Sequence, residues 1–238
     1  MNLSNKIAVV TGAGKGIGRA TAMALAKEGA NLVIISRTMS DLQSLAREIG
    51  NVGRKVLPIQ ADLTRESEIK GVIQESVSKF GGVDVLVNNA GIGRFARVEE
   101  LSTLDWDDMF EINLRAMFIC TREALPQLKR KDESFVINVA SLAGKNAFSG
   151  GAGYAASKWG VLALSKCLML EERDAGVRVL AICPGSVDTH FFHHPSLPKP
   201  NREKVLKPED VAQTIVDAIR LPQRAMVSEI DIRPSNPK

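Results

Sequence analysis

Short apolar runs alternate with amphipathic stretches along nearly the whole chain, and this rhythm restricts its fold more than any other feature. The apolar runs are rich in β-branched residues and bounded by glycine or polar residues, as buried strands are. They cover residues 7–10, 32–35, 56–59, 83–87, 135–139 and 177–182. The stretches between them predict helices at 16–28, 41–49, 65–80, 105–128 and 153–173. This alternation predicts an α/β fold: a doubly wound parallel sheet of about seven strands, with helices on both faces.

Two strands have the marks of sheet edges. Pro58 lies inside the third apolar run, and proline is confined to edge strands or bulges because it cannot donate a ladder hydrogen bond. The last run, residues 227–232, alternates apolar with polar residues, as a half-exposed strand does. Both fit the strand order 3-2-1-4-5-6-7. No linker or repeat interrupts the pattern, so we expect one domain over residues 1–238.

Two helix starts carry capping signals. Ser40 and Gln43 have the spacing of a capping box for the second helix. Thr64 is placed to cap the third helix.

Composition excludes several classes of protein. Apolar residues make up 45% and charged residues 24% of the 238 residues, which are ordinary globular values. The net charge is only +4 and aromatic residues are 5%, so we expect no nucleic-acid binding. No apolar run is long enough for a membrane span, and no signal-peptide pattern precedes the first strand. The three cysteines lie far apart in apolar segments, which favours reduced packing residues and a soluble cytoplasmic protein.

A glycine-rich segment joins the first strand to the first helix. It reads Thr11-Gly12-Ala13-Gly14-Lys15-Gly16-Ile17-Gly18. Glycines at such a turn let the backbone approach a pyrophosphate at the helix N-terminus, so the segment indicates a dinucleotide site, with an ordinary turn as the alternative. A P-loop is excluded because Lys15 is followed by glycine, and the strict G-x-G-x-x-G spacing fails at Ile17.

The end of the second strand indicates which dinucleotide is bound. An NAD site usually places an acid there for the ribose 2′-hydroxyl, but this chain has Ser36 and Arg37. Arg37, helped by Lys15, could bind a 2′-phosphate through charge-assisted hydrogen bonds. We therefore expect NADP(H); the alternative is that both residues are ordinary surface cations.

Tyr154 and Lys158 stand one helical turn apart, and Tyr154 is the single tyrosine. Side chains at this spacing share a helix face. A nearby ammonium could lower the phenol pKa from about 10 toward 7, where a general acid or base works best.

Further motifs make this pair specific. Asn88-Asn89-Ala90-Gly91 follows the fourth strand, Asn113 lies in the long helix, Ser141 ends the fifth strand, and Pro184-Gly185 with Thr189 follows the sixth. In this order on these strand ends, they resemble the short-chain dehydrogenase/reductase family, including its 3-oxoacyl-[acyl-carrier-protein] reductase-like members. The resemblance covers nearly the whole chain and implies a Rossmann-type fold.

The resemblance also implies catalytic roles. Ser141 would hydrogen-bond the substrate carbonyl, and Tyr154 would protonate it as hydride arrives from the nicotinamide. Lys158 would lower the Tyr154 pKa and hold the nicotinamide ribose. Asn113 would position a water in the proton relay.

The cofactor contacts that the resemblance and the residues imply form a larger set. They are Gly12, Lys15, Gly16, Ile17, Gly18, Arg37, Asp62, Leu63, Asn88, Ala90, Gly91, Tyr154, Lys158, Pro184, Gly185, Val187 and Thr189. Family members pair through their long helices, so a homotetramer or homodimer is expected.

Three segments allow more than one interpretation. Residues 190–207 are rich in proline and follow the sixth strand, which favours a substrate lid over an ordinary loop. His190, His193 and His194 could suggest zinc, but no cysteine or acid accompanies them, so no metal is expected. The basic run 129–131 is either a solvated helix end or a docking site for an acidic carrier protein.

The expected function is NADPH-dependent reduction of a carbonyl to a secondary alcohol, with a 3-oxoacyl thioester as substrate. A general aldehyde/ketone or hydroxy-acid dehydrogenase is the alternative within the family. A non-catalytic NADP-binding sensor is a more remote alternative, because the catalytic set is complete.

Overall fold

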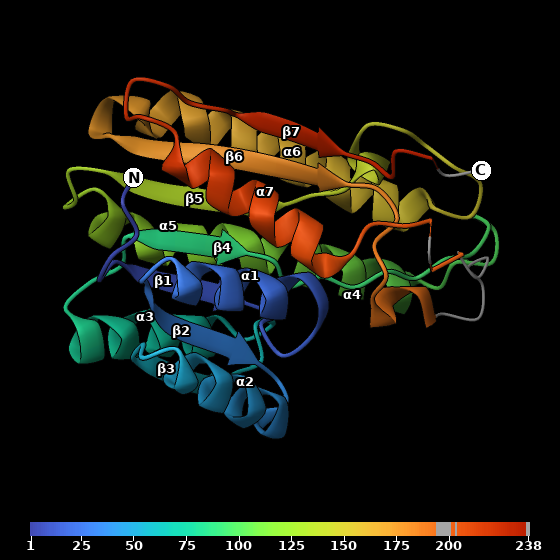
Figure 1. Cartoon of the computed structure of the whole chain (residues 1–238). Coiled ribbons are helices and arrows are strands. Elements are labelled where there is room, and N and C mark those ends of the chain that lie inside the picture. Colours follow the sequence, from blue (N-terminus) through green and yellow to red (C-terminus); the bar gives the residue numbers. More distant parts are fainter. Residues whose placement is uncertain (194–200, 203, 237–238) are drawn as a thin grey trace.

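Seven parallel strands form the central sheet of the computed structural model, which describes residues 1–193, 201–202 and 204–236. Their order is β3-β2-β1-β4-β5-β6-β7, and every neighbouring pair is parallel (Figure 1). The strands are β1 (Ile7–Thr11), β2 (Asn31–Ser36), β3 (Val56–Gln60), β4 (Val85–Asn88), β5 (Ser134–Val139), β6 (Val177–Pro184) and β7 (Glu229–Ile232). The predicted fold class and strand order are confirmed, and Pro58 lies in an edge strand as expected.

Helices cover both faces of the sheet, as Figure 1 shows. One face packs against α1 (Gly16–Lys27), α2 (Met39–Asn51) and α7 (Pro208–Arg220). The other packs against α3 (Glu66–Phe80), α5 (Ala116–Leu128) and α6 (Ala152–Glu172). The inner strands are therefore buried on both sides, which is why they read as continuous apolar runs, whereas the edge strands β3 and β7 are only partly buried.

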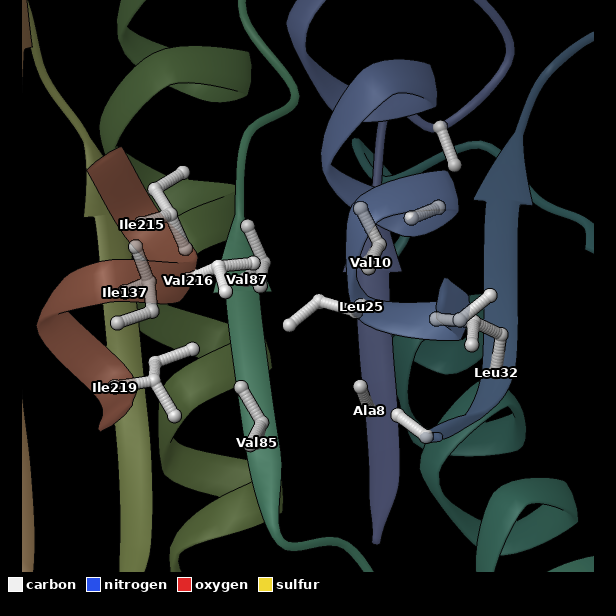
Figure 2. Close-up of a cluster of buried hydrophobic side chains, with 14 of the residues drawn as sticks. Ala8, Val10, Leu25, Leu32, Val85, Val87, Ile137, Ile215, Val216 and Ile219 are labelled. Carbon is white, nitrogen blue, oxygen red and sulfur yellow. The ribbon is translucent and has the colours of Figure 1, made fainter. Parts of the chain in front are cut away.

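Alternate residues of one strand enter different hydrophobic layers. In β1, Ala8 and Val10 contact the first layer, and Val9 between them contacts the second. Figure 2 shows Ala8 and Val10 close to Leu25 of α1, and Ile215 of α7 near β4 and β5. Burial of apolar surface in both layers stabilises the packed sheet by about 25 cal/mol per Å², and so keeps the strand ends together at one edge.

The predicted helix at 105–128 is interrupted. It is divided into α4 (Thr103–Phe110), a π-helical turn at Glu111–Arg115, and α5. The extra residue of a π turn rotates the side chains that follow it, and such turns are frequent at functional sites. Here Asn113 lies in the π turn and is buried, and its side chain hydrogen-bonds to the backbone of Ile92 in the loop after β4. The hydrophobic periodicity of the sequence does not predict this contact.

Both capping predictions are wrong. The residue before α2 is Thr38, so Ser40 lies inside the first turn and no side chain caps that helix. The residue before α3 is Arg65, and the Thr64 hydroxyl instead donates to Asp62 Oδ1 at 2.9 Å. In both cases the helix starts at a different residue from the one that the pattern suggests.

The helix α7 was not expected from the periodicity, although its start signals are in the sequence. Pro208 occupies its first turn, and the Asp210 carboxylate accepts a 2.7 Å hydrogen bond from the Lys207 backbone N–H. This helix fills the layer beside α1 and so completes the cover of β4 and β5.

The predicted lid at 190–207 lies partly outside the described residues, namely at 194–200 and 203. Its described beginning is a 3₁₀ turn at His190–His193. An isolated bridge joins Val187, just before this segment, to Leu206 near its end, and the Asp188 N–H donates to the Leu206 carbonyl at 2.8 Å. Within the described part of the chain, no helix combines the length and apolar character that a bilayer crossing requires.

Candidate active site

A large cleft opens where the parallel strands end. Its volume is about 1690 Å³, which exceeds the roughly 300–1,000 Å³ of a pocket for one drug-sized ligand. Most of the sequence-predicted site residues line it. These are Gly12, Lys15, Gly16, Ile17, Arg37, Asp62, Leu63, Ala90, Gly91, Ser141, Tyr154, Lys158, Pro184, Gly185, Val187 and Thr189. Residues more than 170 positions apart in the sequence therefore meet in one cavity.

The glycine-rich loop is held against the end of β4 by Thr11 and Asn89. The Thr11 hydroxyl accepts from the backbone N–H groups of Asn89 and Ala90, at 2.9 and 3.1 Å. The Asn89 side chain donates to the carbonyls of Thr11 and Gly12. Gly12 has φ +64°, and a Cβ there would lie 2.9 Å from Ala90 Cα. The close approach of the two loops thus requires glycine at this position.

Two of the predicted cofactor contacts, Gly18 and Asn88, do not line the cleft. A Cβ on Gly18 would lie 2.4 Å from the Gly12 carbonyl oxygen, so this glycine lets α1 pack directly under the loop. The Asn88 side chain donates to Thr121 and Asn138, at 3.0 and 2.9 Å, and is buried between β4, β5 and α5. The neighbouring Asn89, which follows the last residue of β4, lines the cleft instead.

Cationic groups gather at the end of β2. Arg37 is exposed there, and the Lys15 ammonium lies 3.5 Å from the Asp41 carboxylate. A backbone hydrogen bond from Thr64 holds the pKa of the nearby Asp62 below its usual value, and the Arg37 charge acts in the same direction. This end of the cleft can receive an anion at Arg37 and Lys15.

Ser141, Tyr154 and Lys158 converge at the other end. Ser141 follows β5, and its hydroxyl oxygen accepts the Ala143 N–H at 3.1 Å. The Ser141 hydroxyl acts on the neighbouring Tyr154 phenol and lowers its pKa. Lys158 is 5% exposed, donates to the Val139 carbonyl at 2.8 Å, and has its ammonium 5.9 Å from the centre of the Tyr154 ring. A hydroxyl pair with a buried ammonium can bind and protonate a carbonyl oxygen.

The expected Tyr154 pKa near 7 is wrong for this structure. Burial raises the pKa of Tyr154 to about 12, and the hydrogen bond with Ser141 opposes that rise. Burial also lowers the pKa of Lys158 to about 8. The ammonium lies over the phenol ring and its bond goes to Val139, so desolvation outweighs charge attraction at Tyr154.

Asn113 lies behind the cleft wall and does not line it. Its amide accepts from the Ile92 N–H at 2.8 Å and donates to the Ile92 carbonyl at 2.9 Å, and it also donates to Ser157 at 3.0 Å. Ile92 itself lines the cleft. Asn113 therefore fixes the backbone at Ile92, beside Gly91, where the wall faces the Lys158 ammonium.

Sequence reasoning missed an aromatic group beside Tyr154. Phe95, Phe148 and Phe191 line the cleft, and each comes from a different loop at the strand ends. Arg94, next to Phe95, forms a 3.2 Å ion pair with Asp105. Single phenylalanines in loops carry no periodic pattern, so only the folded chain identifies them.

The basic run 129–131 lies at the end of α5, just before β5 starts, and so at the edge of the sheet opposite the cleft. Lys129 pairs with Glu172 at 2.8 Å and Lys131 with Asp84 at 3.6 Å. A carrier protein bound there would be on the wrong side to deliver a substrate. We therefore interpret residues 129–131 as a solvated helix end and not as a docking site for a carrier protein.

No cluster of three metal-ligating side chains occurs among the described residues, and His194 lies outside them.

Comparison with known proteins identifies the family. A family model described as short chain dehydrogenase matches residues 6–197. The chain belongs to this family of oxidoreductases, which confirms the resemblance seen in the motifs.

Individual relatives agree with this assignment. The chain is 36% identical over 225 residues to a 3-oxoacyl-[acyl-carrier-protein] reductase of Thermotoga maritima, with 91% of each protein covered. An alcohol dehydrogenase of Thermococcus sibiricus, solved with 5-hydroxy-NADP, is 33% identical with a TM-score of 0.90, covering 98% of this chain and 97% of that one. A 3-ketoacyl-(acyl-carrier-protein) reductase of Brucella melitensis, solved with NADH, is 30% identical with a TM-score of 0.90 and 98% coverage of both chains.

Proposed function

We propose that this protein is an NADP(H)-dependent reductase that converts a carbonyl to a secondary alcohol, with a 3-oxoacyl thioester as its substrate. The observation that carries the proposal is the convergence of Ser141, Tyr154 and Lys158 in the same cleft as the glycine-rich loop. The relatives from Thermotoga maritima and Brucella melitensis, named as reductases of such thioesters, support the substrate.

The residues present fit a phosphorylated dinucleotide. The first turn of α1 contains no acidic side chain and no side chain caps it, so its N–H groups are available to a pyrophosphate. Arg37 and Lys15 would hold the 2′-phosphate, and Asp62 and Leu63 would contact the adenine. When bound, NADPH supplies the hydride that reduces the carbonyl carbon.

The protein's own residues would bind the carbonyl and move one proton. Ser141 would donate a hydrogen bond to the carbonyl oxygen, and Tyr154 would transfer its phenolic proton to the same atom. The raised Tyr154 pKa keeps this proton in place until the oxygen gains negative charge. The Lys158 ammonium would then stabilise the phenolate, and Asn113 would keep the Ile92 wall in position.

A general ketone or aldehyde is the second candidate substrate. The aromatic surroundings of Tyr154 favour it, as does similarity to the Thermococcus sibiricus alcohol dehydrogenase. The two candidates differ in what lies beyond the reacting carbonyl, so they can be separated by assay.

The test is NADPH oxidation with acetoacetyl-coenzyme A, comparing the wild type with Tyr154→Phe. The variant removes only the phenolic oxygen, and no other tyrosine can replace it. We expect turnover in the wild type and a loss of about 10²–10⁴-fold in the variant, the usual contribution of a general acid. NADPH binding without turnover of any thioester, ketone or aldehyde would refute the enzyme proposal and favour a sensor.

The cofactor proposal has its own test in Arg37→Asp. This change places a carboxylate where the 2′-phosphate would bind, so we expect the preference for NADPH over NADH to be lost or reversed. Arg47→Asp alters the net charge equally at an exposed site of α2 outside the cleft and should leave the preference unchanged. Equal binding of both cofactors by the wild type would contradict the proposal.

We further propose that the protein forms a homodimer or homotetramer through α5 and α6. Large apolar side chains are exposed on these helices, with Phe118 at 44%, Trp159 at 54% and Leu170 at 59%. Light scattering should show an oligomer for the wild type and a smaller species for Phe118→Asp. A monomeric wild type would refute the proposal. The three cysteines, all free, support a location in the reducing cytoplasm.

A further inference from the structure

Two phenylalanine rings, Phe95 and Phe191, pack against Tyr154, and a third, Phe148, packs against Phe95. We call these three rings the aromatic wall. The ring centres of Phe95 and Phe191 lie 5.5 and 5.3 Å from that of Tyr154. Phe95 is also 6.0 Å from Phe148 and 5.8 Å from Phe191. All three line the cleft beside the proposed proton donor. A substrate carbonyl at Tyr154 would therefore place a substituent against these rings.

Two glycines give the aromatic wall its shape. A Cβ on Gly93 would lie 2.5 Å from Phe191 Cζ and 2.7 Å from Phe95 Cζ. A Cβ on Gly151 would lie 2.4 Å from Phe148 Cζ. The rings thus rest directly on backbone that carries no side chain. This close packing holds the three rings in position, so the aromatic wall is a preformed part of the cleft.

The charges near the aromatic wall offer little to an anionic substituent. Arg94 precedes Phe95, but its guanidinium pairs with Asp105 and also donates to the Gly93 carbonyl. Asp108, which lines the same cleft, would repel a carboxylate on the substrate. The Lys158 ammonium also lies on this side, but it is buried and donates to the Val139 carbonyl. Arg37 stands at the dinucleotide end of the cleft.

We propose, resting on the function proposed above, that the aromatic wall binds an uncharged alkyl or aryl substituent on the reacting carbonyl. The substrate class is then a carbonyl compound that is apolar on this side: an alkyl or aryl ketone, or a 3-oxoacyl group with a hydrocarbon chain. Sugars and oxo acids with a carboxylate on this side are excluded, since the wall supplies no partner for their polar groups.

A matched pair of ketones tests the proposal. The compounds 6-methylheptan-2-one and 5-oxohexanoate have the same chain, and differ in ending with an isopropyl group or a carboxylate of similar shape. We expect kcat/KM with NADPH to favour the first by about 100-fold, because the carboxylate would lose water without gaining a partner.

Variants of the wall give a second measurement. Phe148 is 45% exposed, so Phe148→Ala should fold, and it should raise the KM for 6-methylheptan-2-one several-fold while the KM for NADPH stays constant. Phe148→Arg should raise kcat/KM for 5-oxohexanoate and lower kcat/KM for 6-methylheptan-2-one. Misfolding cannot produce such a reversal. Phe110→Ala is the control, because Phe110 stacks on Trp106 outside the cleft.

The outcomes separate this proposal from the proposed function. Equal kcat/KM for the two ketones, or no effect of either Phe148 variant on them, would overturn the aromatic wall as a selector and leave the reductase in place. Turnover of acetoacetyl-coenzyme A with none of 6-methylheptan-2-one would do the same. Turnover of no carbonyl compound at all would overturn the proposed function, and this inference with it.

Discussion

Lys158→Met should make the protein inactive and at the same time change how its stability depends on pH. Methionine has a similar length and no charge, so the variant removes the ammonium from α6 without leaving a large cavity. In the folded protein, burial lowers the pKa of Lys158 to about 8 from its ordinary value of 10.5. At pH 7 the lysine is charged in both states, and its burial therefore reduces the free energy of unfolding.

The size and sign of the effect follow from the two pKa values. Between pH 8 and 10.5 the unfolded chain keeps the lysine proton after the folded protein has lost it, so the free energy of unfolding rises with pH. From pH 7 to pH 10 this rise amounts to roughly 2–3 kcal/mol, at about 1.4 kcal/mol per pKa unit. Tyr154, whose pKa is raised to about 12, opposes the trend above pH 10, which sets the upper limit of the experiment.

Urea unfolding at pH 7, 8, 9 and 10 measures the effect in the wild type and in Lys158→Met. The wild type should gain stability relative to the variant by roughly 2–3 kcal/mol over this range, because every other group titrates in both proteins. Lys166→Met, which removes an exposed lysine from the same helix, controls for the loss of one charge. Parallel curves for the wild type and Lys158→Met would refute the reasoning, because the buried ammonium would then carry no desolvation penalty.

Two further predictions concern positioning residues. Asn113→Ala removes three hydrogen bonds of a buried side chain and leaves both backbone groups of Ile92 without partners, so urea unfolding should show a loss of about 2–4 kcal/mol. A change below about 0.5 kcal/mol would show that water replaces the amide. Gly18→Ala should lower the melting temperature and weaken NADPH binding, because its Cβ would overlap the Gly12 carbonyl. Gly71→Ala, on α3 with open space around it, should instead stabilise the protein by about 0.5–1 kcal/mol, and equal effects of the two changes would contradict the packing argument.

The sheet could be predicted because its determinants are local. A run of β-branched residues favours a strand wherever it occurs, and Pro58 can stand only where a ladder hydrogen bond is not needed. These features fit the doubly wound strand order that the structure has. Tyr154 and Lys158 were found in the same way, since their spacing on a helix fixes their common face.

Helix ends and interruptions could not be predicted with the same success. The π turn at Glu111–Arg115 contains Asn113, whose side chain forms two hydrogen bonds with the backbone of Ile92. Ile92 lies about twenty positions earlier in the sequence, so this contact is not local. The start of α2 at Met39 depends on how the chain leaves β2. Both are settled by tertiary contacts that outweigh the small free energies of local capping, about 1 kcal/mol each.

The sequence alone determined the fold class and the family, and it predicted the reacting groups, because strand and helix periods and short motifs are read from neighbouring residues. Only the tertiary structure decided which of two adjacent asparagines, Asn88 or Asn89, faces the cleft. It also decided that the Tyr154 pKa is raised rather than lowered, and that Phe95 and Phe191, from separate loops, stand beside that residue. The physical reason is common to all three: desolvation and packing depend on what distant segments bring to a position, and that is set by the assembled sheet and its loops.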